Sequence, residues 1–122
     1  MSVRAAIYDL LDEVTTSVYP LVAPQETTGS YAVFSVNLEV IRIQNGVEMK
    51  EADLILEIYS SGDNGFDSCV TLAESFYTAL EGASGTYGGE ALEVCNFIRE
   101  SDDYISDLDK FNIRQEYNLK FN

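Results

Sequence analysis

Apolar residues alternate with polar ones along three separate segments, and this alternation limits the chain to folds that contain a sheet with one buried face. Every second side chain is apolar from Ala32 to Val40, and the pattern resumes over residues 52–58. Successive side chains of a strand point to opposite faces, so each segment predicts a half-buried strand. The third and most regular segment closes the chain and places on one face Phe111, Ile113, Tyr117, Leu119 and Phe121.

The three strands belong to two predicted hairpins. An Asn-Gly pair lies between the first two strands, and this pair is typical of tight turns between antiparallel strands. The tip of this hairpin, Gln44–Glu51, should project beyond the sheet because its charged residues do not continue the apolar face. In the second hairpin, a strand over Ala91–Arg99 precedes an acidic turn over Glu100–Lys110 and the closing strand.

Two segments carry apolar residues at helical spacing. Residues 2–16 predict an amphipathic helix that Pro20 prevents from continuing. A cluster of Gly, Ser, Asp and Asn at Ser60–Gly65 is followed by a second predicted helix, Phe66–Leu80, which ends near Gly82. The order helix, hairpin, helix, hairpin predicts a single α+β domain over residues 1–122, with an antiparallel sheet of about four strands and helices packed on one face.

The segment before the first strand holds two prolines, Pro20 and Pro24, within a mostly uncharged stretch. Each proline fixes φ near about −65° and favours an extended conformation at the preceding residue. The connector therefore holds a defined shape. Two interpretations stay open: it crosses the surface of its own domain, or it forms a preshaped strap against a neighbouring subunit.

Charge argues against several classes of partner. Twenty-one acidic residues against seven basic ones give a net charge of −14, which opposes binding to nucleic acid phosphates and to anionic lipid surfaces. No apolar run approaches the roughly 20 residues that a bilayer-spanning helix needs, so no membrane association is expected.

The residue types also argue against catalysis. The chain has no histidine, which removes the commonest general base and metal ligand. Cys69 and Cys95 lack electropositive neighbours in the sequence and are interpreted as buried, reduced thiols. The glycine-rich loop Gly82–Gly89 lacks the lysine and the following helix of a phosphate-binding loop. We therefore expect no enzyme activity, no catalytic residue and no cofactor.

A cluster of aspartates within the acidic turn could supply ligands to a cation. Its members are Asp102, Asp103, Asp107 and Asp109. Their oxygen atoms suit calcium, but the spacing does not match a helix-loop-helix calcium site. Acidic turns are usually only solvated, so no metal ligand is predicted.

In the order of several short motifs, the sequence resembles the tail terminator, or tail completion, proteins of long-tailed phages and prophages. The motifs are Val18-Tyr19-Pro20, Ala23-Pro24-Gln25, an aromatic strand opening at Tyr31, Leu56-Glu57-Ile58-Tyr59-Ser60, the helix Phe66–Leu80 with Glu81-Gly82, and a closing strand Ile113–Phe121 after an acidic turn. Each motif is short, so the resemblance depends on their order over nearly the whole chain.

The resemblance implies a structural virion protein that closes into a ring, commonly a hexamer, on the head-proximal end of the tail tube. Such a ring stops tube growth and offers a surface to a head-tail connector or neck protein. It is assembled in the cytoplasm of the bacterial host and ends in the virion tail. DNA passes through the central hole without specific binding, and acidic side chains lining the hole would keep phosphates from adhering.

Two groups of residues follow as candidate contacts. For the subunit interface we expect Tyr19, Pro20, Pro24, Gln25 and Tyr31. For the loops that contact the tube or the neck we expect Asn45, Gly46, Glu48, Lys50, Thr86 and Tyr87. Long loops without core residues are usually functional or disordered, which is why the two loops were chosen.

Two alternative functions remain open from the sequence. One is a neck or head-completion protein of the same virion, a class that also combines helices with a sheet. The other is an acidic mimic of DNA that inhibits a nucleic-acid-binding protein by presenting carboxylates in place of phosphates.

Overall fold

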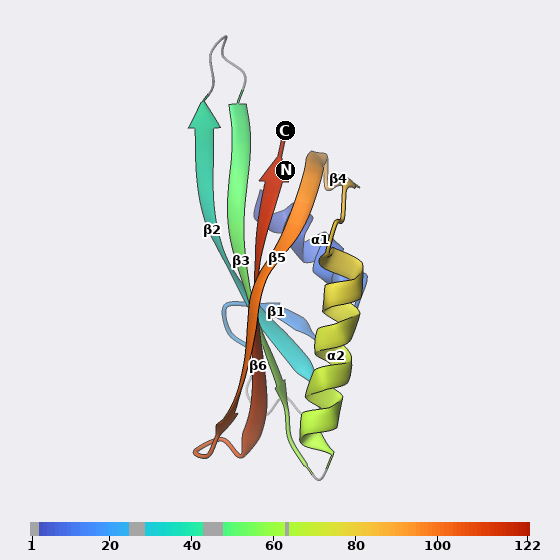
Figure 1. Cartoon of the computed structure of the whole chain (residues 1–122), viewed down its shortest axis with the longest axis vertical. Helices are drawn as coiled ribbons and strands as arrows, with labels where there is room; N and C mark the ends of the chain where they lie inside the picture. Colours follow the sequence, from blue (N-terminus) through green and yellow to red (C-terminus); the bar gives the residue numbers. More distant parts are fainter. Residues whose placement is uncertain (1–2, 25–28, 43–47, 63) are drawn as a thin grey trace.

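The computed structural model describes residues 3–24, 29–42, 48–62 and 64–122. Within these ranges the chain forms two helices and six strands (Figure 1). Their bounds are α1 Val3–Asp12, β1 Val18–Pro20, β2 Tyr31–Arg42, β3 Glu48–Ser60, α2 Gly65–Leu80, β4 Gly85–Tyr87, β5 Glu90–Ile105 and β6 Lys110–Phe121.

The six described strands form one mixed sheet in the order β1-β2-β3-β6-β5-β4. Strand β1 pairs parallel to β2, and all the other neighbours are antiparallel. The predicted sheet of about four antiparallel strands under a layer of helices is therefore wrong. The difference arises from two three-residue strands, one at each edge, that lack the length to show any alternation in the sequence.

The sheet is strongly twisted and curled, and the two helices meet it in different ways (Figure 1). Helix α2 packs against β3, β5 and β6, whereas α1 contacts β1 and β4, the two opposite edges. The register of β5 against β6 shifts twice, between Leu92 and Val94 and between Phe97 and Arg99. Such irregularities bend a strand and increase its twist, which accounts for edges that curl towards the same helix.

A single hydrophobic cluster lies between the helices and the sheet. The alternation predicted for β3 is confirmed, since Ala52, Leu54, Leu56 and Ile58 are all fully buried. The closing strand is confirmed in the same way by Ile113, Tyr117, Leu119 and Phe121. Helix α1 contributes Ile7 and Leu11, and α2 contributes Cys69, Phe76 and Leu80. Burial of this apolar surface is the main stabilising term of the fold.

Strand β6 also brings one polar side chain into the core. Gln115 is fully buried, and its amide nitrogen donates to the carbonyl oxygen of Ala73 at 2.9 Å and to Glu100 at 2.8 Å. Its amide oxygen accepts from the hydroxyl of Tyr117 at 2.9 Å. The side chain thus ties β6 to α2 and β5, and its polar atoms are satisfied.

The proline connector folds back onto its own domain at its first half. Residues Val18–Pro20 form β1, which pairs with Ala32–Phe34 of β2. Proline has no N–H to donate and is tolerated at the edge of a sheet, where β1 lies. Leu21 follows with φ of 65°, a left-handed conformation that is uncommon for a leucine.

The acidic turn is much shorter than predicted. Strand β5 runs to Ile105 and β6 begins at Lys110, so only residues 106–109 turn. Residues Glu100–Tyr104 are exposed, and they continue β5 along Phe111–Gln115 of β6. The predicted glycine loop likewise contains β4, which pairs with Glu90–Leu92.

Candidate subunit-interaction surface

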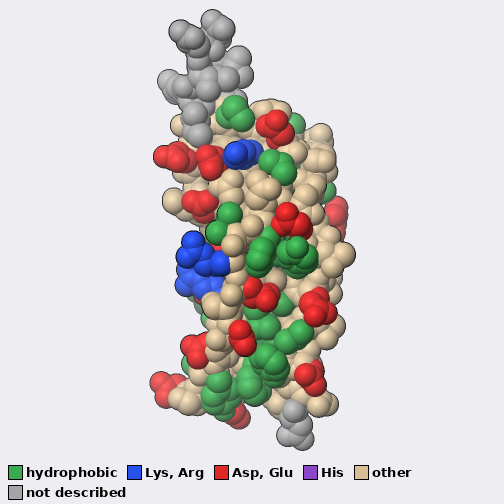
Figure 2. Space-filling model, viewed as in Figure 1, with side chains coloured by type: hydrophobic (Ala, Val, Ile, Leu, Met, Phe, Trp, Pro, Cys, Tyr) green, Lys and Arg blue, Asp and Glu red, His purple; other side chains and the backbone are tan. Residues whose placement is uncertain are grey.

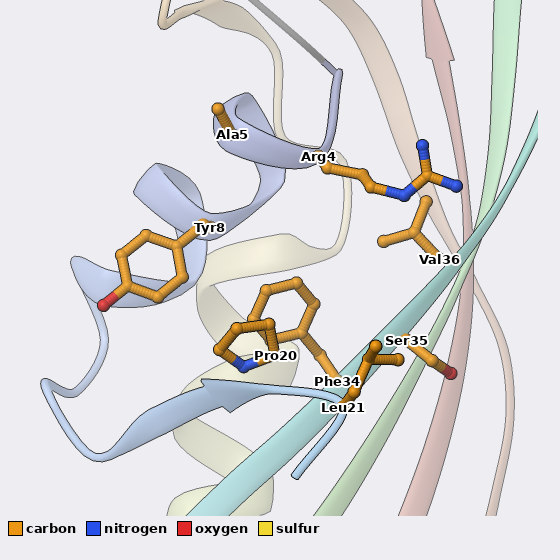
Figure 3. Close-up of a pocket in the computed structure, with 8 residues that line it drawn as sticks. All are labelled: Arg4, Ala5, Tyr8, Pro20, Leu21, Phe34, Ser35 and Val36. Carbon is orange, nitrogen blue, oxygen red and sulfur yellow. The ribbon is translucent and has the colours of Figure 1, made fainter. Parts of the chain in front are cut away.

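An apolar pocket lies between α1, the end of β1 and the middle of β2. It has a volume of about 280 Å³ and is lined by Arg4, Ala5, Tyr8, Pro20, Leu21, Phe34, Ser35 and Val36 (Figure 3). Of these eight residues only Arg4 is charged. An apolar hollow with one cation at its rim is suited to bind an apolar side chain with a neighbouring carboxylate.

Local packing explains why the pocket stays open. The rings of Tyr8 and Phe34 lie 6.0 Å apart and form one wall. Strand β1 covers β2 only as far as Phe34, so Ser35 and Val36 lie beyond its end. Leu21 donates its N–H to the carbonyl oxygen of Phe34 at 2.9 Å, which holds its backbone against β2 at the rim of the pocket.

The residues predicted for the subunit interface divide into two groups. Pro20 lines the pocket and Pro24 is exposed, whereas Gln25 lies outside the described residues. Tyr31 is buried: its ring stacks on Tyr59 at 5.3 Å and meets the edge of Tyr19 at 6.5 Å. The structure therefore places Tyr19 and Tyr31 together in an aromatic cluster of the sheet itself.

Lys110 completes this aromatic cluster. Its ammonium group donates to the hydroxyl of Tyr31 at 2.6 Å and lies 4.7 Å from the centre of the same ring. Cation–π contact and a charge-assisted hydrogen bond both stabilise the arrangement. The cluster joins β6, β2 and β1 and leaves Tyr31 little surface for a partner.

The start of β3 and strand β4, which carry the predicted contact residues Lys50, Thr86 and Tyr87, lie towards one end of the molecule (Figure 1). Asn45, Gly46 and the side chain of Glu48 lie outside the described part. Lys50, in the stem of the first hairpin, forms an ion pair of 3.1 Å with Glu90 at the β4–β5 turn. Thr86 is exposed, and Tyr87 is half-buried against the core. The two predicted contact loops are therefore joined through Lys50 and Glu90.

The β5–β6 turn presents an apolar side chain that the sequence reasoning treated only as part of an acidic turn. Leu108 is 58% exposed at the tip of the hairpin, beside Asp107 and Asp109. On the face shown in Figure 2, hydrophobic side chains gather over α2 and the adjoining strands, among scattered acidic ones. The sequence signal for an exposed Leu108 was its position between two aspartates in a tight turn.

The pocket residues Arg4, Tyr8 and Leu21 were not predicted as contacts either. Arg4 is exposed on the first turn of α1, and Leu21 is 73% exposed. An apolar residue directly after a strand-forming proline, Pro20-Leu21-Val22, was the available sequence signal for the rim of the pocket.

The thiols show no sign of activation. Burial raises the pKa of Cys69 to about 11 and that of Cys95 to about 12, so both groups hold their protons near neutral pH. Across residues 3–24, 29–42, 48–62 and 64–122, no three His, Cys, Asp or Glu side chains are grouped to bind a metal ion. No helix in the described part is long and apolar enough to cross a bilayer.

Comparison with known proteins yields a likeness in fold. No family model and no curated protein matches the chain. Among solved structures, the chain is similar to a chain in the virion of a native gene transfer agent (GTA) particle, with a TM-score of 0.78 and 20% sequence identity. The likeness covers 98% of this chain and 94% of the other. At this identity it establishes a shared fold.

Proposed function

We propose that this protein is a structural component of a phage-like virion that caps the head-proximal end of a tail tube as a ring, commonly a hexamer. The observation that carries the proposal is the likeness in fold to a chain of a gene transfer agent virion over nearly the full length of both chains. A match of this extent concerns the whole domain and not a shared local motif. The role is not enzymatic: bonds are neither made nor broken.

The physical logic of a cap requires two different faces. A contact between unlike surfaces of identical subunits closes into a ring when its rotation closes. One face of the ring then copies a tube subunit, and the other face does not accept one, so the tube stops growing. The end of the molecule that carries Lys50, Thr86 and Tyr87 is our candidate for contact with the tube or the neck protein.

The charge of the chain supports passage of DNA without retention. Acidic side chains are exposed on β3, β5 and the β5–β6 turn, and they would repel phosphates that pass through a central hole. Localisation follows from this role: assembly in the bacterial cytoplasm and residence in the virion tail.

Deletion of the gene in cells that produce the particle tests the proposal. We expect tubes of uncontrolled length, seen by negative-stain microscopy, and capsids without joined tails. Complementation with the intact gene should restore both properties. Tubes of normal length that fail to join capsids would instead favour the neck or head-completion role.

A second experiment tests the predicted contact loop. Replacement of residues 44–47 by two glycines, with the stem kept, should leave folding intact and abolish capping. Normal tubes with intact caps in this variant would remove the loop from the contact surface. Capture of a host DNA-binding protein by a protein with no effect on tubes would favour the DNA mimic.

A further inference from the structure

The tip of the β5–β6 hairpin is a rigid apolar knob. Leu108 donates its N–H to Ile105 at 3.2 Å, and Asp109 donates to Ser106 at 3.3 Å, so the turn is closed by its own backbone. Tyr104 packs on the ring of Phe111 at 5.0 Å directly beneath the turn, and its hydroxyl bonds to Asp109. The knob is therefore held in shape before any partner binds, which lowers the ordering cost of docking.

The pocket between α1 and β2 is a socket of matching chemistry. Tyr8, Phe34 and Val36 provide apolar walls, and the side chain of Arg4 extends over the β2 side of the opening (Figure 3). None of the ion pairs among the described residues uses Arg4. At the rim, Leu21 is exposed and held at a positive φ of 65°. A leucine in this conformation is strained, and strain of this kind clusters at binding sites.

Charge complementarity selects the occupant. The pocket offers one cation and apolar walls, and the hairpin tip offers one exposed leucine beside the carboxylates of Asp107 and Asp109. We propose that the Leu108 tip of one copy docks into the α1–β2 pocket of a second copy, with Asp107 facing Arg4. This inference rests on the proposed function insofar as it assumes that copies of the chain assemble with one another.

The knob and the socket cannot meet within one molecule. The β5–β6 tip lies at the lower end of the structure, and α1 lies beside the opposite half of the sheet (Figure 1). Joining two unlike surfaces of identical chains is a heterologous contact, which generates a ring or an open filament. The contact therefore supplies the kind of interface that a ring requires.

Cross-linking in solution tests the contact without any tube. We choose Ala5→Cys, which lines the pocket from α1, and Ser106→Cys, which lies in the turn; both leave Leu108 and Arg4 intact. The two single variants are mixed and treated with a short bismaleimide over a concentration series. The native thiols Cys69 and Cys95 are buried and do not compete. The matched control replaces Ala5→Cys by Thr78→Cys, an exposed position on α2.

The Ala5–Ser106 pair should give a cross-linked heterodimer at a yield well above that of the Thr78 control. Adding Leu108→Asp should lower the apparent affinity about 10- to 100-fold, because a buried leucine is replaced by a carboxylate. Arg4→Asp should weaken the contact, and Asp107→Arg in the second variant should restore it. Circular dichroism of each variant confirms that it is folded.

Equal yields from the pocket pair and the control pair at every concentration would overturn the inference, as would cross-linking that ignores Leu108→Asp. The result is separable from the proposed function. Specific cross-links together with normal tubes in the gene deletion would remove the cap and leave the contact. Loss of length control in the deletion together with equal cross-linking would keep the cap and remove the contact.

Discussion

The two long hairpins of the sheet differ in regularity, and the irregular one carries the long exposed stretch of strand. In the first, β2 and β3 pair without a shift from Tyr31 and Tyr59 to Arg42 and Glu48. In the second, β5 slips twice against β6. Beyond the second shift β5 is exposed as far as Tyr104, and it ends in the Leu108 turn.

The contrast has a simple physical origin. Strands β3 and β6 are neighbours in the centre of the sheet, so each must present an unbroken apolar row to the core. Strand β5 has a neighbour of only three residues, β4, on its outer side. It can bulge and extend past the core at little cost, since edge strands commonly do so. The exposed Leu108 turn proposed for self-association therefore lies on the less regular hairpin, whereas the pocket proposed to receive it is lined by β2 of the regular one.

The largest expected difference between the two hairpins is in the free energy of unfolding after alanine substitution. Leu56→Ala in β3 removes a fully buried side chain and should lower the free energy of unfolding by about 2–5 kcal/mol. Ile98→Ala in β5 removes a side chain that is 49% exposed, so its effect should stay within about 0.5 kcal/mol. Urea denaturation with a fixed m-value measures both. Equal losses would mean that β5 carries as much of the core as β3.

The next largest effect concerns the buried amide of Gln115, which joins the second hairpin to α2. Gln115→Leu leaves the Tyr117 hydroxyl without its acceptor in the core and should cost about 1–3 kcal/mol. Tyr117→Phe alone leaves the amide oxygen unpaired. The double variant removes both polar groups, so its loss should be smaller than the sum by about 0.5–3 kcal/mol. Strictly additive losses in urea denaturation would show that the hydrogen bond contributes nothing.

The same contrast explains how much of the fold the sequence predicted. Strands β2, β3 and β6 followed from period-two alternation because one face of each is buried and the other is not. Helix α2 was predicted over Phe66–Leu80 and runs over Gly65–Leu80, although its Phe66 and Tyr77 are exposed. Helix α1 stops at Asp12, short of the expected end, because β-branched residues and a turn follow.

What the sequence did not predict depends on contacts between distant segments. The parallel pairing of Val18–Pro20 with β2 has no local pattern, because three residues cannot show a period. The sequence predicts a turn over the outer half of β5 because Glu100–Tyr104 is exposed on both faces and so carries no alternation. The pocket arises from α1, β1 and β2 together, and no single stretch of sequence encodes it.

The labelling rates of the two native thiols compare the opening of β5 with that of α2 in one unmodified molecule. Cys95 lies on β5 between the two register shifts, whereas Cys69 lies on α2 with its sulfur 3.5 Å from the carbonyl oxygens of Ile58 and Phe111. Burial raises the pKa of both thiols, so a maleimide should reach them only when the structure opens. We expect Cys95 to react at least about tenfold faster, which corresponds to about 1.4 kcal/mol less for its opening.

Peptide mass spectrometry after timed labelling gives the two rates in the same sample, so differences in global stability cancel. Equal rates would indicate that both thiols become accessible through one global unfolding event. The irregular pairing of β5 would then have no dynamic consequence.

The smallest expected effect comes from the ion pair that couples the two hairpins at the end of the molecule. Lys50 binds both carboxylate oxygens of Glu90, at 3.1 and 3.2 Å, and the two side chains are 31% and 12% exposed. Exposed pairs contribute about 0.2–1 kcal/mol, so a cycle of Lys50→Ala and Glu90→Ala should give a coupling energy in that range at low salt. The coupling should fall as salt rises, because screening weakens pairs that contact water. A matched cycle of Arg99→Ala and Glu116→Ala, within the second hairpin and with Arg99 more exposed, should give less. A larger coupling there would place the stronger electrostatic link inside the irregular hairpin instead of between the two hairpins.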